Sequence, residues 1–165
     1  NGMTIPSGPL RENINNLKKY ENIFLNGNLE NLTNLEKYIK DINPKINIHV
    51  GKYEAINLDE FKKSNNYLVF TGIGNHQTFV SMLKESGLRI LKDLEFPDHF
   101  KYSEKDINNI ILEASKLNCD IITTEKDYLR LNKKNRKNVK FLKIDLSVKN
   151  LKKFSKFLFE RLWKN

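Results

Sequence analysis

From Tyr67 onward, short apolar segments alternate with segments that start like helices, and this alternation constrains the fold more than any other feature of the chain. Two of the apolar segments are YLVF, at residues 67–70, and DIITT, at residues 120–124. Strands that alternate with helices form βαβ units, whose strands are parallel. The sequence therefore predicts an α/β fold in which helices flank a mostly parallel sheet.

Two of the predicted helices begin at a hydroxyl residue that is followed three positions later by an aspartate. These pairs are Ser103 with Asp106 and Thr124 with Asp127. In a capping box the hydroxyl accepts a hydrogen bond from a first-turn amide, and the acidic side chain reaches back to the backbone of the capping residue. We expect helices to start at Ser103 and Thr124.

The first part of the chain has a helix, a strand and a second helix in its pattern. The first helix ends near Tyr20, the strand is NIFLN, a turn follows at residues 26–28, and the second helix covers residues 29–40.

The segment after Pro44 is predicted to be a hinge. Its apolar residues Ile46, Ile48 and Val50 alternate with polar ones, which favours an exposed two-stranded ribbon over a core strand. The predicted hinge covers residues 46–65 and separates residues 1–45 from a small α/β domain at residues 66–165.

Composition narrows the classes of function. The chain has 165 residues and a net charge of +9, but its lysines are scattered rather than clustered with arginine and aromatic residues, so we expect no nucleic-acid partner. No apolar run approaches the roughly 18 residues that a membrane-spanning helix needs. The one cysteine, Cys119, favours a reducing cytoplasm, and no activating cation stands beside it in the sequence.

An acid and an imidazole stand side by side in FPDH, residues 96–99, just before the helix start at Ser103. Loops at the carboxyl edge of a parallel sheet are where ligands bind, and Pro97 stiffens this one. His99 could move protons near neutral pH, and the Asp98 carboxylate could fix its tautomer or hold a metal. The alternative is that Asp98 caps a turn and that His99 lies on the surface or bonds a carbonyl.

Two further segments have both a functional and a structural interpretation. TGIGN, residues 71–75, follows a strand and opens a helix, as a phosphate-binding turn does, but it lacks the third glycine of G-x-G-x-x-G, so a simple tight turn is the alternative. PSGPLRE, residues 6–12, ends in Arg11 and Glu12; Arg11 could clamp phosphate oxygens, or the two could form a surface ion pair. No G-x-x-x-x-G-K-[ST] occurs in the chain.

His49 and His76 have no partner at metal-ligand spacing, so we expect structural roles for both and no metal site. The last helix, from about Ser147, places apolar residues on one stripe with lysines mostly elsewhere. Such a helix could contact an anionic bilayer, or its stripe could cover the edge of its own sheet.

Four segments in this order and spacing resemble the C-terminal half of tetraacyldisaccharide 4'-kinase, the lipid A 4'-kinase of Gram-negative bacteria. The segments are NGMTIPSGPLRE, VFTGIGNHQTF, FPDHFKYSEKD and ITTEKDYLRL. FPDH and TTEKD together with GPLRE are the specific ones, and the likeness spans nearly the whole chain. His76 departs from the family, which commonly has proline after GIGN.

The resemblance implies a membrane-associated P-loop kinase that uses ATP and Mg²⁺. It would transfer the γ-phosphate to the 4'-hydroxyl of a lipid A disaccharide 1-phosphate, as a peripheral monomer on the cytoplasmic face of the inner membrane. Residues 1–45 would then belong to the kinase core, joined by a β-ribbon hinge to the small domain. The Walker lysine, the metal-binding aspartates and the catalytic carboxylate would lie upstream of Asn1, so we expect the isolated chain to be inactive.

The resemblance also implies roles for four residues. His99 would pair with the catalytic carboxylate, and Asp98 would orient the loop or the metal shell. Arg11 would stabilise charge on the transferring phosphoryl group, and Glu12 would support Arg11. The alternatives are a stand-alone, non-enzymatic α/β binding module and, on the strength of the net charge alone, a basic nucleic-acid binder.

Overall fold

A computed structural model describes residues 10–26 and 32–163 of the chain. The chain divides into two compact units. The terminal unit contains Asn1–Tyr53 and Leu146–Asn165, and the central unit contains Glu54–Asp145.

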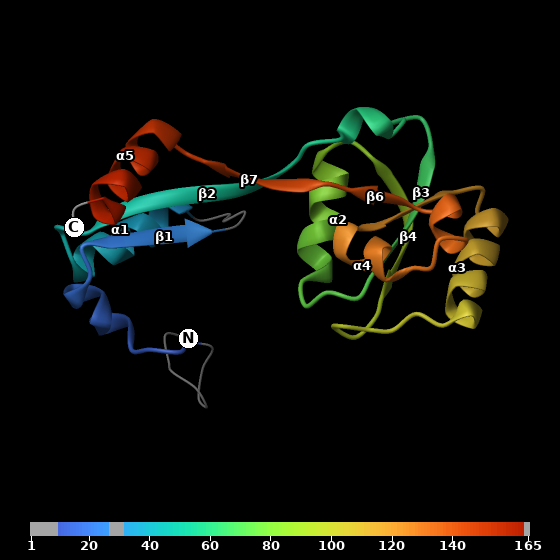
Figure 1. The fold of residues 1–165 in the computed structure, drawn as a ribbon, viewed down its shortest axis with the longest axis horizontal. Helices are drawn as coiled ribbons and strands as arrows, with labels where there is room; N and C mark the ends of the chain where they lie inside the picture. The colour runs from blue at the N-terminus through green and yellow to red at the C-terminus, as the bar shows by residue number, and fades with distance from the viewer. Residues whose placement is uncertain (1–9, 27–31, 164–165) are drawn as a thin grey trace. The chain divides into compact units, whose positions relative to one another are not determined.

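The central unit is built on a four-stranded sheet with strand order β4-β3-β5-β6 (Figure 1). Neighbouring strands pair in parallel throughout. The strands are β3 (Asn66–Thr71), β4 (Arg89–Glu95), β5 (Asp120–Thr124) and β6 (Lys140–Leu142). The predicted α/β class with a mostly parallel, helix-flanked sheet is confirmed.

Helices cover both faces of this sheet. Along β3 successive side chains point to opposite faces: Val69 shares a buried cluster with Leu83 of one helix, and Phe70 shares another with Ile107 of a second helix. The burial of β3 on both faces explains its continuous apolar run. The helices are α2 (His76–Glu85), α3 (Glu104–Lys116) and α4 (Glu125–Arg130), with the 3-10 helices η2 (Leu58–Glu60) and η3 (Asn135–Asn138).

The apolar segment VKFLKIDL, residues 139–146, does not form one continuous strand, because the structure divides it at Lys143. The Asn57 side chain accepts a hydrogen bond from the Lys143 N–H (2.8 Å) and donates one to the Phe141 carbonyl (3.1 Å). The Lys143 carbonyl in turn accepts from the Ile56 N–H at 3.0 Å. These bonds satisfy the backbone at the break, so β6 ends and β7 (Ile144–Val148) begins there.

The terminal unit is built on a three-stranded sheet with order β1-β2-β7, in which β1 and β2 are parallel. The helix predicted to end near Tyr20 is a short 3-10 helix, and part of the predicted turn at residues 26–28 lies outside the described residues. The elements are η1 (Ile14–Lys19), β1 (Asn22–Asn26), α1 (Leu32–Ile42), β2 (Asn47–Ala55) and α5 (Leu151–Leu162), with β7 as above.

The segment expected to be an exposed ribbon is partly a core strand, so that prediction is wrong for its first half. Ile46 is fully buried and forms the core of the terminal unit with Leu25 and Ile39. The chain passes from one unit to the other within β2 and returns within β7, and these strands are neighbours in one sheet. That this ribbon works as a hinge stays a prediction.

The last helix lies with the terminal unit, whereas the predicted division placed it in the small domain. The His49 ring lies 5.0 Å from the rings of both Phe154 and Phe157, so α5 covers the β2 face of its own sheet. The contact of Phe154 fits the interpretation that the stripe covers its own sheet, and contact of α5 with a bilayer stays a prediction. Among the described residues, no helix combines the length and the apolar character that spanning a bilayer requires.

Candidate active site

Three of the quoted motifs meet at the carboxyl ends of β3, β4 and β5 in the central unit. Gly72 of TGIG follows β3, the FPDH loop follows β4, and Thr124 of TTEKD ends β5 and caps α4. In an open α/β sheet this edge is the usual place for a ligand. The sequence predicted this position for Asp98 and His99.

His99 stands in a left-handed backbone conformation, with φ of 61°. Its N–H donates to the Gly72 carbonyl (3.2 Å) and to Asp98 Oδ1 (2.9 Å). Residues other than glycine are uncommon in this conformation, which costs about 1–2 kcal/mol, although asparagine, aspartate and histidine adopt it more often than the rest. The two hydrogen bonds hold it there, and strain of this kind gathers at functional sites.

An aromatic cluster supports the FPDH loop. The ring centroids of Phe96 and Phe100 lie 4.9 Å apart, and Tyr102 lies 5.3 Å from each of them. Phe70 of β3 contacts Tyr102 edge to face at 5.2 Å, which ties the cluster to the buried sheet. The loop is therefore anchored on both sides of the Asp-His pair, while Asp98 and His99 themselves remain exposed.

Asp98 lies beside the imidazole. Asp98 Oδ2 is 3.6 Å from His99 Nε2, and Asp98 Oδ1 is 3.9 Å from the Lys126 ammonium. The side chains of Asp98 and His99 are 48% and 72% exposed, so both can reach a molecule at the sheet edge. The turn is closed by the Phe100 N–H, which donates to the Pro97 carbonyl at 3.1 Å, while Asp98 accepts from the adjacent His99 N–H and faces its ring.

Sequence reasoning missed Arg130, which contacts the histidine from α4. Its guanidinium donates to the Asp127 carboxylate (3.0 Å) and to the Gly72 carbonyl (3.2 Å), and its second terminal nitrogen lies 3.2 Å from His99 Nδ1. The only signal in the sequence is that Arg130 lies three residues after Asp127, one helical turn away.

Asp127 caps α4 differently from the prediction. The Thr124 hydroxyl accepts from the Asp127 N–H (3.1 Å), as in a capping box. The Asp127 carboxylate, however, accepts from the Thr124 hydroxyl (2.7 Å) and the Gly72 N–H (3.0 Å) instead of reaching back to the capping backbone. The Ser103 box forms in full, and its hydrogen bonds lower the pKa of Asp106.

Position 72 requires glycine because atoms of neighbouring side chains lie where a Cβ would be. A Cβ at this position would lie 2.9 Å from the Tyr102 hydroxyl and 3.3 Å from both Asp127 Oδ1 and Phe100 Cβ. The Tyr102 hydroxyl is buried without a hydrogen-bond partner in the described part of the chain. Burial, and then the neighbouring Asp127 carboxylate, raise the pKa of Tyr102. Because the Gly72 N–H is taken by Asp127, the tight-turn interpretation of TGIGN fits better than a phosphate loop.

The other candidates have structural surroundings. His76 is buried and bridges the Thr71 hydroxyl (2.8 Å) and Asp93 (3.1 Å). His49 lies in the terminal unit, where burial and then Lys153 lower its pKa. Burial, and then Asp120, raise the pKa of the Cys119 thiol, which argues against a reactive thiolate.

Arg11 and Glu12 belong to the terminal unit, whereas the residues around His99 belong to the central unit. Both are exposed. Glu12 accepts hydrogen bonds from Tyr20 (3.2 Å) and Asn16 (3.4 Å), and the bond to Glu12 raises the pKa of Tyr20. The roles of Arg11 and Glu12 stay predictions.

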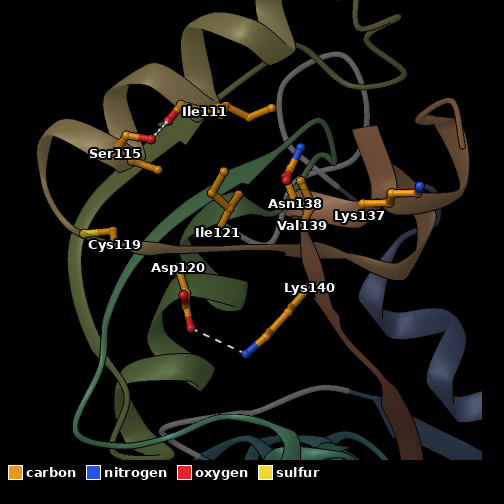
Figure 2. Close-up of a pocket in the computed structure, with 10 residues that line it drawn as sticks. Ile111, Ser115, Cys119, Asp120, Ile121, Lys137, Asn138, Val139 and Lys140 are labelled. Carbon is orange, nitrogen blue, oxygen red and sulfur yellow. Dashed lines mark hydrogen bonds and ion pairs between the residues drawn. The ribbon is translucent and has the colours of Figure 1, made fainter. Parts of the chain in front are cut away.

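A cavity of about 340 Å³ lies at the opposite edge of the central sheet, where β5 and β6 begin. Figure 2 shows Asp120 and Lys140 paired at its rim, 3.4 Å apart, and none of the predicted site residues lines it. Nor do the described residues contain a cluster of three or more histidine, cysteine or acidic side chains that could hold a metal. The convergence of charged groups on His99 therefore marks the carboxyl edge as the candidate site.

The central unit has the architecture of an open parallel α/β domain, a class of protein whose ligands usually bind at the carboxyl ends of the strands. The family model described as tetraacyldisaccharide-1-P 4'-kinase matches residues 1–162. The chain therefore belongs to the tetraacyldisaccharide-1-P 4'-kinase family, which confirms the resemblance read from its motifs.

Individual relatives of the chain bear the name of the same family. The tetraacyldisaccharide 4'-kinase of Pelagibacter ubique (strain HTCC1062) is 56% identical over 165 residues, which is 100% of this chain and 52% of that protein. The tetraacyldisaccharide 4'-kinase of Rickettsia akari (strain Hartford) is 36% identical over 151 residues, 91% of this chain and 44% of that protein. The chain thus spans about half the length of the curated relatives it matches.

The fold is also similar to a solved structure. The crystal structure of the "apo" form of LpxK from Aquifex aeolicus in complex with ATP matches with a TM-score of 0.59 at 20% identity. The match covers 95% of this chain and 47% of that one. At this identity the likeness supports the shared fold.

Proposed function

We propose that this chain is the C-terminal half of an ATP-dependent kinase that phosphorylates the 4'-hydroxyl of tetraacyldisaccharide 1-phosphate. The observation that carries the proposal is the His99 imidazole, exposed on a strained loop and held by groups from three motifs. The relatives of this chain bear the name of this kinase and are about twice as long as the chain. We use "intact kinase" for a polypeptide of that length that ends in this chain.

The residues of this chain do not suit ATP or Mg²⁺ on their own, because the sequence has no Walker A motif and the described residues have no metal-binding cluster. Both would be bound mainly by the other half of the intact kinase. The work of this chain would be positioning and charge stabilisation, which supply most of the rate in phosphoryl transfer.

In this mechanism His99 pairs with the catalytic carboxylate of the other half, which accepts the proton of the sugar hydroxyl. Asp98 orients the imidazole through the contacts described above. Arg11 stabilises charge on the transferring phosphoryl group, and Glu12 supports Arg11. Domain closure in the intact kinase would bring His99 to this carboxylate.

The intact kinase should transfer the γ-phosphate of ATP to tetraacyldisaccharide 1-phosphate, whereas the 165-residue chain alone should give no product. Labelled ATP, chromatography of the lipid and determination of the phosphorylated position would measure this. An intact protein that binds the lipid but transfers nothing would contradict the kinase proposal and favour a binding module.

We also propose that the protein is a peripheral monomer on the cytoplasmic face of the inner membrane, attached in part through α5. Four apolar side chains at the end of this helix are exposed: Leu158, Phe159, Leu162 and Trp163. Lys152 and Lys156 on the same helix are exposed as well, and basic residues beside apolar ones favour an anionic bilayer.

Replacing both Phe159 and Leu162 with serine should weaken binding of the intact kinase to vesicles rich in phosphatidylglycerol by about tenfold or more, because each side chain contributes about 1.5–3 kcal/mol when buried. Cosedimentation would measure the change. The control is Leu112→Ser, which removes an equally exposed leucine of α3. Equal binding by the double variant and the control would rule out α5 as the contact.

A further inference from the structure

We propose that Arg130 is a positioning residue that holds the neutral His99 imidazole with its proton on Nε2, so that His99 meets its partner as a hydrogen-bond donor. The inference deepens the proposed function and rests on it for its kinetic consequence. The tautomer itself depends only on the contacts within the central unit.

Contacts with groups other than the histidine fix the position of the Arg130 guanidinium. One of its terminal nitrogens, Nη1, bonds both Asp127 Oδ1 (3.0 Å) and the Gly72 carbonyl (3.2 Å). The Asp127 side chain is fully buried and that of Arg130 is 23% exposed. A buried carboxylate and a backbone carbonyl thus set the plane of the guanidinium, which leaves Nη2 directed at His99 Nδ1 at 3.2 Å.

The chemistry of arginine then determines the tautomer. A guanidinium has only N–H donors and stays protonated in proteins, so its partner must be an acceptor. Nδ1 of His99 therefore carries no proton in this contact, and the proton of the neutral ring is on Nε2. The Asp98 carboxylate lies 3.6 Å from Nε2 and favours the same arrangement, because a carboxylate attracts an N–H.

The backbone of the loop is tied to the same arginine. The Gly72 carbonyl accepts both the Arg130 bond and the His99 N–H, each at 3.2 Å. Arg130 consequently contacts the group that holds the left-handed backbone of His99 as well as its ring. Both contacts therefore restrict the position of the His99 ring.

The informative variant is Arg130→Lys, because an ammonium can still pair with the buried Asp127 but lacks the planar fork that also reaches Gly72 and His99. The control is Arg136→Lys. Arg136 also binds several acceptors, the carbonyls of Tyr128 (3.2 Å), Leu131 (2.9 Å) and Leu129 (2.6 Å), and no described contact joins it to His99. Both variants lose a similar set of hydrogen bonds in one region.

The tautomer is measured by ¹⁵N NMR of the 165-residue chain labelled at histidine, at about pH 8.5, well above the ordinary range for histidine. His99→Asn assigns the signals. We expect an unprotonated Nδ1 and a protonated Nε2 in the wild type and in Arg136→Lys, and a mixture of tautomers in Arg130→Lys. A protonated Nδ1 in the wild type, or an unchanged tautomer in Arg130→Lys, would overturn the proposal.

In the intact kinase, Arg130→Lys should lower kcat by about 10- to 100-fold, the range found when a partner that orients a histidine is removed, with little change in KM for ATP. Arg136→Lys should retain kcat. An equal loss of kcat in both variants would show that Arg130 acts on stability alone. An inactive wild-type kinase would refute the proposed function, while the NMR result would still decide the tautomer.

Discussion

Replacing His99 with alanine is expected to lower the turnover of the intact kinase by about 10²- to 10⁴-fold, the contribution typical of a positioned acid or base. The imidazole would otherwise support the catalytic carboxylate while it takes the proton of the 4'-hydroxyl. Steady-state assays with saturating ATP and lipid measure the change. The free energy of unfolding should barely change from lost contacts, because the His99 side chain is 72% exposed.

The backbone at His99 demands a second variant. Alanine in a left-handed conformation costs about 1–2 kcal/mol, whereas asparagine tolerates it and has no imidazole. If turnover depends on the imidazole, His99→Asn and His99→Ala should lower kcat by a similar factor, even though asparagine keeps the geometry of the loop. Restored turnover in His99→Asn would instead show that only the conformation of the loop is needed, and it would refute the assigned role.

Replacing Asp127 with alanine is expected to lower the free energy of unfolding by about 3–5 kcal/mol, because removing one member of a buried ion pair leaves the other uncompensated. The carboxylate is fully buried and accepts from Arg130, the Thr124 hydroxyl and the Gly72 N–H. Its loss would leave these donors unsatisfied beneath the site. Urea denaturation of the 165-residue chain, followed by circular dichroism, gives the change.

An exposed ion pair provides the comparison for Asp127. Lys140→Met breaks the ion pair between Lys140 and Asp120. The Lys140 ammonium lies 3.4 Å from Asp120 Oδ2, and both side chains are about half exposed. Surface pairs contribute about 0–1 kcal/mol, so this variant should stay near the wild type. A change in Asp127→Ala no larger than that in Lys140→Met would mean that the network beneath His99 does not stabilise the domain.

Much of the candidate site could be predicted because its parts are local in the sequence. Asp98 and His99 are adjacent, Pro97 precedes them, and the hydroxyl caps at Ser103 and Thr124 follow from spacing alone. Arg130 could not be predicted in the same way, because it contacts His99 across 31 positions of the chain. That contact exists only because β4 and β5 both pair with β3, which brings the loop after β4 close to α4 after β5.

The same limit explains the errors in the fold. Asn57 interrupts the chain between β6 and β7 at Lys143 through hydrogen bonds that span more than 80 positions, and no local pattern indicates such a contact. Alternation at Ile46 to Val50 indicated a strand correctly, but its burial depends on packing against Leu25 and Ile39. The last helix showed its apolar stripe in the sequence, yet which sheet it covers depended on the return of β7 beside β2.

Periodicity, caps and short motifs are properties of neighbouring residues. The sequence alone therefore predicted the order of strands and helices, the α/β class and the Asp-His loop. The family membership was readable as well, because its motifs are short and ordered. Burial, the partners of Asp127 and the tautomer of His99 depend on residues far apart in the chain. Those features were decided only when the sheet formed, since pairing of distant strands determines which polar groups lose water and must find a partner.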